Sequence, residues 1–264
     1  MSKSLLAGTR PRRSRCTQCS PDAFGLANQP RPAYMHPMHN DINALTLRPF
    51  EAAIFDMDGT ILDTETVFRN IVFDVCADLG FEMTDTVHHA MVGSSHETTN
   101  QLLVEAYGVA FPYSQFDDMC RTSMRDQLVA GVPVKPGARE ILLELRARNI
   151  PTAIATSSRR AHAHLHLEVA GLIDMFDTIV TRDDVINPKP NPEPYLTAAE
   201  RLGVAPRLCL AFEDSHSGVR AAHGAGMQTI MVPDLVHPSD EIRALGIVIV
   251  ESLVHVHQAA FPTR

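Results

Sequence analysis

The chain has 264 residues, of which 45% are hydrophobic and 20% are charged, as is ordinary for a soluble α/β protein. This length allows one large domain or two modest ones, with a sizeable core in either case. A formal net charge of −8 excludes the basic surface of a general nucleic-acid-binding protein, and no apolar run approaches the ~18–20 residues that cross a bilayer. Five cysteines without a regular spacing indicate free thiols in a reducing compartment, so we expect a cytoplasmic protein without nucleic-acid or membrane partners.

Residues 1–50 lack the pattern of a packed domain. Basic side chains precede the first acidic residue, Asp22, and prolines recur through Pro37. A basic, acid-poor segment of this kind is typical of a disordered arm or of a transit peptide for organelle import. A third interpretation is that translation begins later, at Met35 or Met38. Under each interpretation we expect the arm to carry no chemistry.

The first element of the folded part is the stretch from Ala52 to Thr60, with the sequence AAIFDMDGT. Its apolar half predicts a strand buried on both faces, as in a parallel sheet covered by helices. The strand ends at Asp56 and Asp58, two carboxylates that would repel each other and lose hydration unless a cation neutralised them. Open α/β sheets bind ligands at the carboxyl ends of their strands, so we interpret this pair as a candidate Mg²⁺ site.

Residues 66–131 have a helical pattern. Apolar side chains repeat at helical spacing from Val67 to Leu79, and Gly80 follows as a stop signal. Two further helices are predicted at residues 102–106 and 119–128, and a polar loop is predicted at residues 91–97, between the first helix of this region and the second. A helical block inserted directly after a strand-end site can act as a lid over that site, or it can pack simply as a helical subdomain.

After Pro136-Gly137 helices and strands alternate. Helices are predicted at residues 138–148, 161–170, 194–202 and 218–225. Strands are predicted at residues 151–156, 176–180, 208–212, 229–232 and 247–250. Alternation at this spacing predicts right-handed βαβ crossovers and a parallel sheet with helices on both faces.

Polar groups follow several of these strands, and in a parallel sheet they would meet at one edge. Beyond the two aspartates, this edge would receive Thr156, Ser157 and Ser158, then Lys189, and then Glu213, Asp214 and Ser215. Taken singly, each group is better explained as a helix cap or a solvated loop residue. Four successive sites that all offer groups for a metal and a phosphate are poorly explained in that way.

These groups suit phosphoryl transfer. A carboxylate nucleophile such as Asp56 can form an aspartyl-phosphate, which splits one difficult step into two. Asp58 can protonate the leaving oxygen and later deprotonate the attacking water. Mg²⁺ held by carboxylates neutralises phosphate charge, while a lysine, hydroxyls and backbone N–H groups stabilise the equatorial oxygens.

Four segments together resemble the four signature motifs of haloacid dehalogenase-like hydrolases: residues 56–60, 156–157, 189 and 213–215. Their order and spacing are similar to the subgroup that contains β-phosphoglucomutase and pseudouridine-5′-phosphatase, and the resemblance covers residues 52–254. It implies an α/β fold with a Rossmann-like parallel sheet core, formed by residues 51–65 and 132–264, and an inserted helical cap at 66–131.

The resemblance also implies roles for individual residues. Asp56 would be the nucleophile, and Asp58 the general acid and base. The Mg²⁺ ligands would be Asp56, Asp58 through its backbone carbonyl, Asp214 and Glu213. The groups that hold the transferring phosphoryl would be Thr156, the Ser157 backbone and Lys189.

Within the family, Asp58 argues against a dehalogenase, which lacks this second aspartate. The absence of lysine from residues 65–129 argues against a phosphonatase with a cap lysine, and Thr60 favours hydrolysis over a mutase. We therefore predict a monomeric, Mg²⁺-dependent phosphomonoesterase for a small phosphorylated metabolite: a sugar, polyol or nucleoside phosphate. The alternatives are a β-phosphoglucomutase-type phosphomutase and a non-catalytic binding protein, and the presence of both aspartates argues against the latter.

Substrate specificity is expected from the polar cap loop, a later cap helix and the residues after the second motif. The candidates are Gly93, Ser94, His96, Arg125, Ser158 and Arg159. The loop residues suit sugar hydroxyls, although an ordinary helix cap explains them equally well. His162 and His166 lie one helical turn apart and are interpreted as surface histidines.

Overall fold

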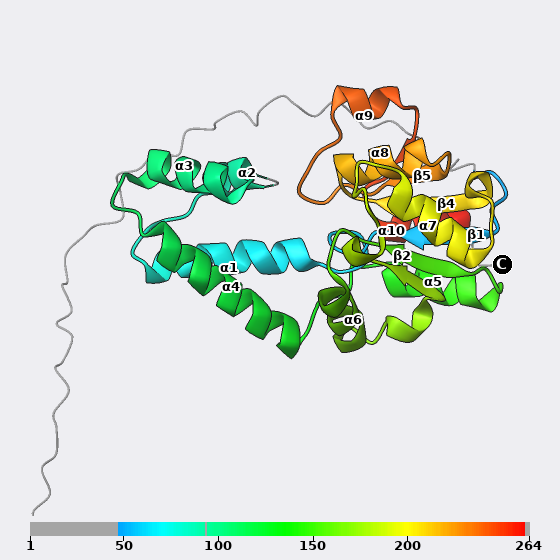
Figure 1. The fold of residues 1–264 in the computed structure, drawn as a ribbon, viewed down its shortest axis with the longest axis horizontal. Helices are drawn as coiled ribbons and strands as arrows, with labels where there is room; N and C mark the ends of the chain where they lie inside the picture. Colours follow the sequence, from blue (N-terminus) through cyan, green and yellow to red (C-terminus); the bar gives the residue numbers. More distant parts are fainter. Residues whose placement is uncertain (1–46, 93, 262–264) are drawn as a thin grey trace, which may run out of the picture. The chain divides into compact units, whose positions relative to one another are not determined.

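The computed structural model describes residues 47–92 and 94–261, so the interpretations of residues 1–46 and of Gly93 fall outside it. Within these residues, one six-stranded sheet has the order β3-β2-β1-β4-β5-β6, and all neighbouring strands are parallel (Figure 1). The strands are β1 Ala52–Phe55, β2 Thr152–Ala155, β3 Thr178–Val180, β4 Cys209–Glu213, β5 Gln228–Met231 and β6 Val248–Ile249. The order reverses at β1, which is where such sheets open a crevice for ligands. The predicted fold class is confirmed.

Alternate side chains of the central strand enter two separate cores. Ala53 and Phe55 of β1 belong to one buried cluster, and Ala52 and Ile54 belong to a second cluster. Successive residues of a strand point to opposite faces, so a strand covered on both sides is apolar throughout, as β1 is. After residue 137, the helices that contribute to the first cluster are α5 Ala138–Ala147, α6 Arg160–Val169 and α10 Leu253–Ala260. Those of the second are α7 Glu193–Leu202 and α8 His216–Gly224.

The elements after residue 137 follow the predicted alternation, and their ends differ from the predicted ends by one or two residues. Two short helices, α9 (Asp240–Ala244) and α10, have no counterpart in the sequence prediction. Each buries only one or two apolar side chains, too few to give a helical repeat that a sequence pattern can reveal. None of the described helices has the length and apolarity needed to span a membrane.

Between β1 and β2 the chain forms a group of helices, called the helical insertion below. Its members are α1 Thr64–Asp78, α2 Asp85–Met91, α3 His96–Tyr107 and α4 Tyr113–Ala130. Most of their buried apolar side chains form a third cluster, whereas Leu128 of α4 belongs to the first cluster. The sequence pattern does not predict α2, where histidines interrupt the apolar residues, but the hydroxyl of Thr84 caps this helix by accepting a hydrogen bond from the Val87 amide at 3.3 Å. The division into domains at residues 51–65, 66–131 and 132–264 stays a prediction.

The two linkers that join the helical insertion to the sheet lie side by side. Leu62 and Val134 form an antiparallel bridge, and the Asp63 amide donates a hydrogen bond to the Pro133 carbonyl at 2.8 Å. Lys135 Nζ lies 3.1 Å from Asp63 Oδ1 and 2.7 Å from an Asp234 carboxylate oxygen in the loop after β5. All three side chains are largely buried, so this ion-pair triad fastens both linkers to the core.

We expect the Lys135→Met variant to lose about 2–3 kcal/mol of unfolding free energy, because it leaves Asp63 and Asp234 buried without their cation. Urea unfolding followed by circular dichroism measures the loss. The control is Arg125→Met, which removes an exposed pair with Asp126 and should cost less than about 1 kcal/mol. Equal losses in the two variants would contradict a stabilising role for the triad.

Candidate active site

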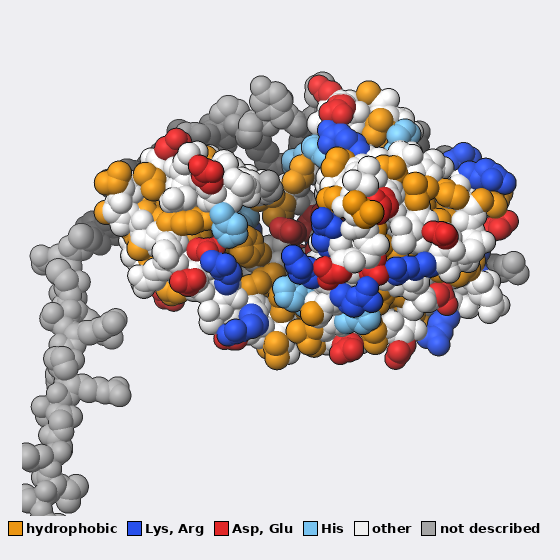
Figure 2. All heavy atoms as spheres, viewed as in Figure 1, with side chains coloured by type: hydrophobic (Ala, Val, Ile, Leu, Met, Phe, Trp, Pro, Cys, Tyr) orange, Lys and Arg blue, Asp and Glu red, His pale blue; other side chains and the backbone are white. Residues whose placement is uncertain are grey.

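The carboxyl ends of β1 and β4 bring acidic groups together at the middle of the sheet. In the parallel register Phe55 of β1 pairs with Phe212 of β4, so Asp56 and Glu213 leave neighbouring strands at the same level. The Asp56 amide donates a hydrogen bond to the Phe212 carbonyl at 2.9 Å, and only 7% of Asp56 is exposed. Figure 2 shows acidic side chains at the bottom of a hollow in the molecular surface, with basic side chains beside it.

Lys189 joins these two carboxylates. It comes from the loop between β3 and α7, and its Nζ lies 2.5 Å from Asp56 Oδ1 and 2.5 Å from Glu213 Oε1. Burial alone would lower the pKa of Lys189, but the two carboxylates raise it above its usual value, so the lysine is a cation. Burial raises the pKa of Asp56, and Lys189 opposes that rise. The pKa of Asp56 stays raised overall, so the ammonium group favours the charged carboxylate without fully offsetting its burial.

Glu213 is fully buried and accepts hydrogen bonds on both of its oxygens. Besides Lys189, the hydroxyl of Tyr195 donates to Oε1 at 2.8 Å. Oε2 accepts bonds from the amides of Asp214 and Ser215, each at 3.1 Å, and from the Ser215 hydroxyl at 3.0 Å. A carboxylate has about four lone-pair sites, and donors within the protein occupy them all.

Asp214 is held by the turn that follows β1. Thr60 Oγ1 donates a hydrogen bond to Asp214 Oδ1 at 3.2 Å. Gly59 has a φ of +81°, and a Cβ added there would overlap the Asp214 carboxylate, so this position requires glycine for two reasons. Burial, and after it the charge of Glu213, raise the pKa of Asp214. A bound cation would oppose this rise.

Asp56, Glu213 and Asp214 form an acidic cluster at the candidate metal site, in which both oxygens of Glu213 already accept hydrogen bonds. One carboxylate oxygen of each lies within 4.8 Å of the others. An all-oxygen ligand set of this kind is what Mg²⁺ prefers. Because Gly59 has no side chain, the Asp214 carboxylate can occupy its place beside the β1 turn and serve as a ligand. The residues therefore fit the cation that the sequence predicts.

Asp58 lies beside the residues that follow β2. Ser158 Oγ donates a hydrogen bond to Asp58 Oδ2 at 2.7 Å, and the Ser158 amide donates to Thr156 Oγ1 at 3.0 Å. Thr156 is buried, whereas the neighbouring Ser157 is exposed. Ser158, which the sequence indicates as a specificity residue, thus contacts the candidate acid–base group instead.

The other specificity candidates make contacts of their own. Within the helical insertion, Ser94 Oγ bonds to the Met91 carbonyl at 2.8 Å and to Thr99 Oγ1 at 2.7 Å. His96 Nδ1 lies 3.3 Å from the Tyr113 hydroxyl, in the first turn of α3 rather than in the predicted loop. On α4 of the same insertion the exposed Arg125 pairs with Asp126 at 3.6 Å, and outside the insertion the exposed Arg159 pairs with Asp183 at 3.4 Å. Among the described residues, none of these four side chains forms a hydrogen bond with Asp56, Asp58, Glu213 or Asp214.

The interpretation of both histidines on α6 as surface residues is half wrong. His162 is exposed, but only 7% of His166 is exposed. Helix α4 packs against α6, so α6, which its own sequence pattern suggests is exposed to solvent, is partly covered. Burial lowers the pKa of His166, which favours its neutral form.

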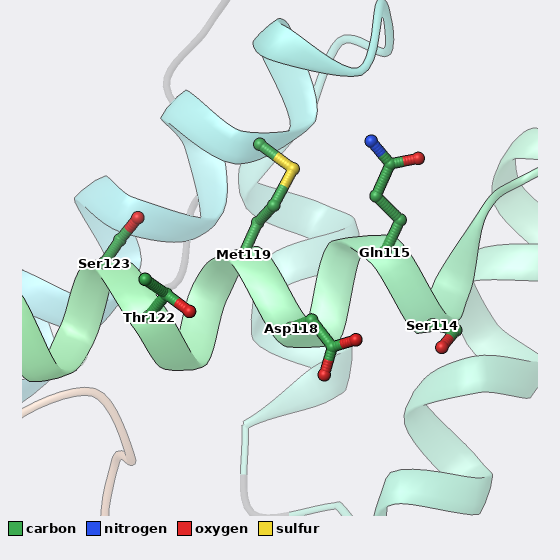
Figure 3. Close-up of a pocket in the computed structure, with 6 residues that line it drawn as sticks. All are labelled: Ser114, Gln115, Asp118, Met119, Thr122 and Ser123. Carbon is green, nitrogen blue, oxygen red and sulfur yellow. The ribbon is translucent and has the colours of Figure 1, made fainter.

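A second hollow, of about 560 Å³, lies over α4 (Figure 3). The residues that line it are Ser114, Gln115, Asp118, Met119, Thr122 and Ser123. None of them is a strand-end residue, so this hollow has no part in the site at the sheet edge.

Comparison with known proteins assigns the family. A family model described as haloacid dehalogenase-like hydrolase matches residues 53–232. The chain belongs to this family. A phosphorylated carbohydrates phosphatase of Thermotoga maritima is 34% identical over 195 residues, which cover 74% of this chain and 89% of that protein. A fructose-1-phosphate phosphatase of Escherichia coli is 32% identical over 183 residues, which cover 69% of this chain and 96% of that protein.

Among solved structures, a haloacid dehalogenase family hydrolase of Deinococcus radiodurans with bound phosphate and sodium matches with a TM-score of 0.71. It is 28% identical, and the match covers 80% of this chain and 95% of that one. The predicted family and the prediction of an enzyme of the phosphatase class are confirmed. The roles of the individual site residues stay predictions.

We expect the Gly218→Ala variant to lose about 2 kcal/mol or more of stability, because an added Cβ would overlap the Glu213 carboxylate at the start of α8. Gly224→Ala on the same helix is the matched control. Its added Cβ meets only a Pro192 carbon at 3.8 Å, and the change from glycine to alanine favours a helix by up to about 1 kcal/mol. Thermal unfolding of both variants measures the difference, and equal melting temperatures would contradict the close packing of Glu213.

Proposed function

We propose that this protein is a Mg²⁺-dependent phosphomonoesterase that works through an aspartyl-phosphate on Asp56. The observation that carries the proposal is the buried contact of Lys189 with Asp56, in a group that also contains Asp214. A nucleophile, a fixed cation and a metal site within one strand-end crevice are the parts that phosphoryl transfer needs.

Asp56, Asp214 and the backbone carbonyl of Asp58 would hold the metal directly. Glu213, whose lone pairs are occupied by other donors, would act mainly through Lys189. When bound, Mg²⁺ supplies positive charge that neutralises the phosphate oxygens.

The chain's own residues would carry the two steps. In the first, an Asp56 oxygen attacks phosphorus, the bond from phosphorus to the ester oxygen breaks, and Asp58 gives that oxygen a proton. In the second, water attacks phosphorus, Asp58 takes a proton from the water, and Asp56 is regenerated as inorganic phosphate leaves. Lys189, the Thr156 hydroxyl and the Ser157 amide would stabilise the equatorial oxygens. Ser158 would keep Asp58 in place between turnovers.

The substrate we propose is a small phosphorylated sugar, polyol or nucleoside. The two named relatives, by their names, act on phosphorylated carbohydrates and on fructose 1-phosphate. Thr60 favours hydrolysis over the mutase alternative, and its hydroxyl contacts Asp214 within the candidate metal site.

We expect wild-type protein to release phosphate from some members of a phosphomonoester panel with Mg²⁺ and to stop when a chelator is added. Asp56→Asn should lower the rate by about 10⁴-fold or more while circular dichroism stays unchanged, because an amide is not a nucleophile here. The control Asp78→Asn changes an exposed residue at the end of α1 and should keep full activity.

Release of phosphate by Asp56→Asn at the wild-type rate would refute the proposal. If folded wild-type protein with Mg²⁺ bound releases no phosphate from any member of the panel, the mutase is favoured instead. Hexose 1-phosphates with a sugar bisphosphate would then test the mutase, because a mutase needs that activator and accumulates no free phosphate.

A further inference from the structure

Tyr195 is a buried tyrosine in a cluster of small side chains. It lies on α7 and is 0% exposed, beneath the face of the sheet that carries Ala52 and Ile54. Of the described residues, it is the only aromatic member of this cluster, and most of its buried neighbours are alanines. The alanines make room for one ring, and this ring reaches the level of the strand ends.

Tyr195 contacts both members of the ion pair at the site. Its hydroxyl donates a hydrogen bond to Glu213 Oε1 at 2.8 Å, and Lys189 Nζ lies 5.1 Å from the centre of its ring. A buried phenol needs a hydrogen-bond partner, and a charged acceptor makes the bond stronger than one to a neutral group. The ring face adds a cation–π attraction for the ammonium group.

The contacts of Lys189 show why the hydrogen bond from Tyr195 to Glu213 affects phosphate binding. A lysine has three N–H donors, of which two bond to Asp56 and Glu213, so one remains for a phosphoryl oxygen. Glu213 Oε1 divides its acceptor capacity between Lys189 and Tyr195. Without the phenol, this oxygen would bond to Lys189 alone and draw the ammonium group away from Asp56. Burial raises the pKa of Tyr195 well above its usual value, so the hydroxyl stays a donor across the physiological pH range.

We propose that Tyr195 is a positioning residue: its hydroxyl fixes Glu213, and through Glu213 it fixes Lys189 in the place from which Lys189 binds the phosphoryl group. The proposal rests on the phosphatase function proposed above. It goes beyond that function because it assigns a role to a side chain that touches neither the substrate nor the metal.

The test compares Tyr195→Phe with the wild type. This change keeps the ring and removes only the hydroxyl. We expect kcat/KM for the best phosphomonoester of the panel to fall about tenfold. We also expect the Kd for inorganic phosphate, measured by calorimetry with Mg²⁺, to rise by a similar factor while the Kd for Mg²⁺ alone changes less than twofold. Phosphate affinity is the decisive measurement, because a purely structural tyrosine would not alter it in folded protein.

Tyr107→Phe is the matched control. The Tyr107 hydroxyl also donates one hydrogen bond at 2.8 Å, to the Glu82 carbonyl within the helical insertion. This variant should keep the wild-type Kd for phosphate and lose less stability than Tyr195→Phe, because Tyr107 is only partly buried and its acceptor is neutral. A folded Tyr195→Phe variant that binds phosphate like the wild type would overturn the inference.

The calorimetric measurement separates the two proposals. A wild type that binds phosphate but hydrolyses nothing would refute the phosphatase function, and the comparison of phosphate affinities would still decide the role of Tyr195. A wild type that hydrolyses its substrate, with Tyr195→Phe unchanged in both measurements, would refute only the positioning role.

Discussion

The buried ammonium group of Lys189 is the contact on which the site depends. It lies between Asp56 and Glu213, and Asp214 belongs to the same acidic group. A buried charge without a partner destabilises a protein by several kcal/mol, so the lysine is what allows these carboxylates to lie at the end of a fully buried strand. One lysine does not balance three carboxylates. The remaining negative charge raises the affinity of this place for a cation, so the charges that destabilise the fold also favour a metal ion at the candidate metal site.

Glu213 shows how the fold supports this arrangement. It is the last residue of β4, and the amides of Asp214 and Ser215, in the turn that leads into α8, donate hydrogen bonds to its carboxylate. Helix N-termini stabilise negative charge in this way. Gly218 lets the first turn of α8 approach closely, because any side chain there would overlap Glu213. Strand, turn and helix thus form one support for a single carboxylate.

The sequence predicts the fold and the meeting of polar residues at the strand ends well, because both depend on local patterns. The apolar run of β1, the alternation after Gly137 and the polar groups at strand ends can all be recognised within a few neighbouring residues. What the sequence cannot predict are contacts between distant residues. The Ser158 bond to Asp58 spans 100 positions, and α4 packs against α6, the helix that carries the buried His166. Tyr195 has the pattern of an ordinary core aromatic residue, and only the three-dimensional arrangement shows its hydroxyl on Glu213.

The paired linkers at Leu62 and Val134 have a consequence for how this architecture can vary. The chain leaves the sheet at Asp63 and returns at Pro133, and these two residues are joined by a backbone hydrogen bond. The ends of the intervening segment therefore meet at one point, so its length adds little to the entropy of closing the loop. Such a segment can be lengthened, shortened or exchanged without altering the register of any strand. Under the proposed function, the recognition of the rest of the substrate can thus diverge while the groups at the sheet edge stay the same.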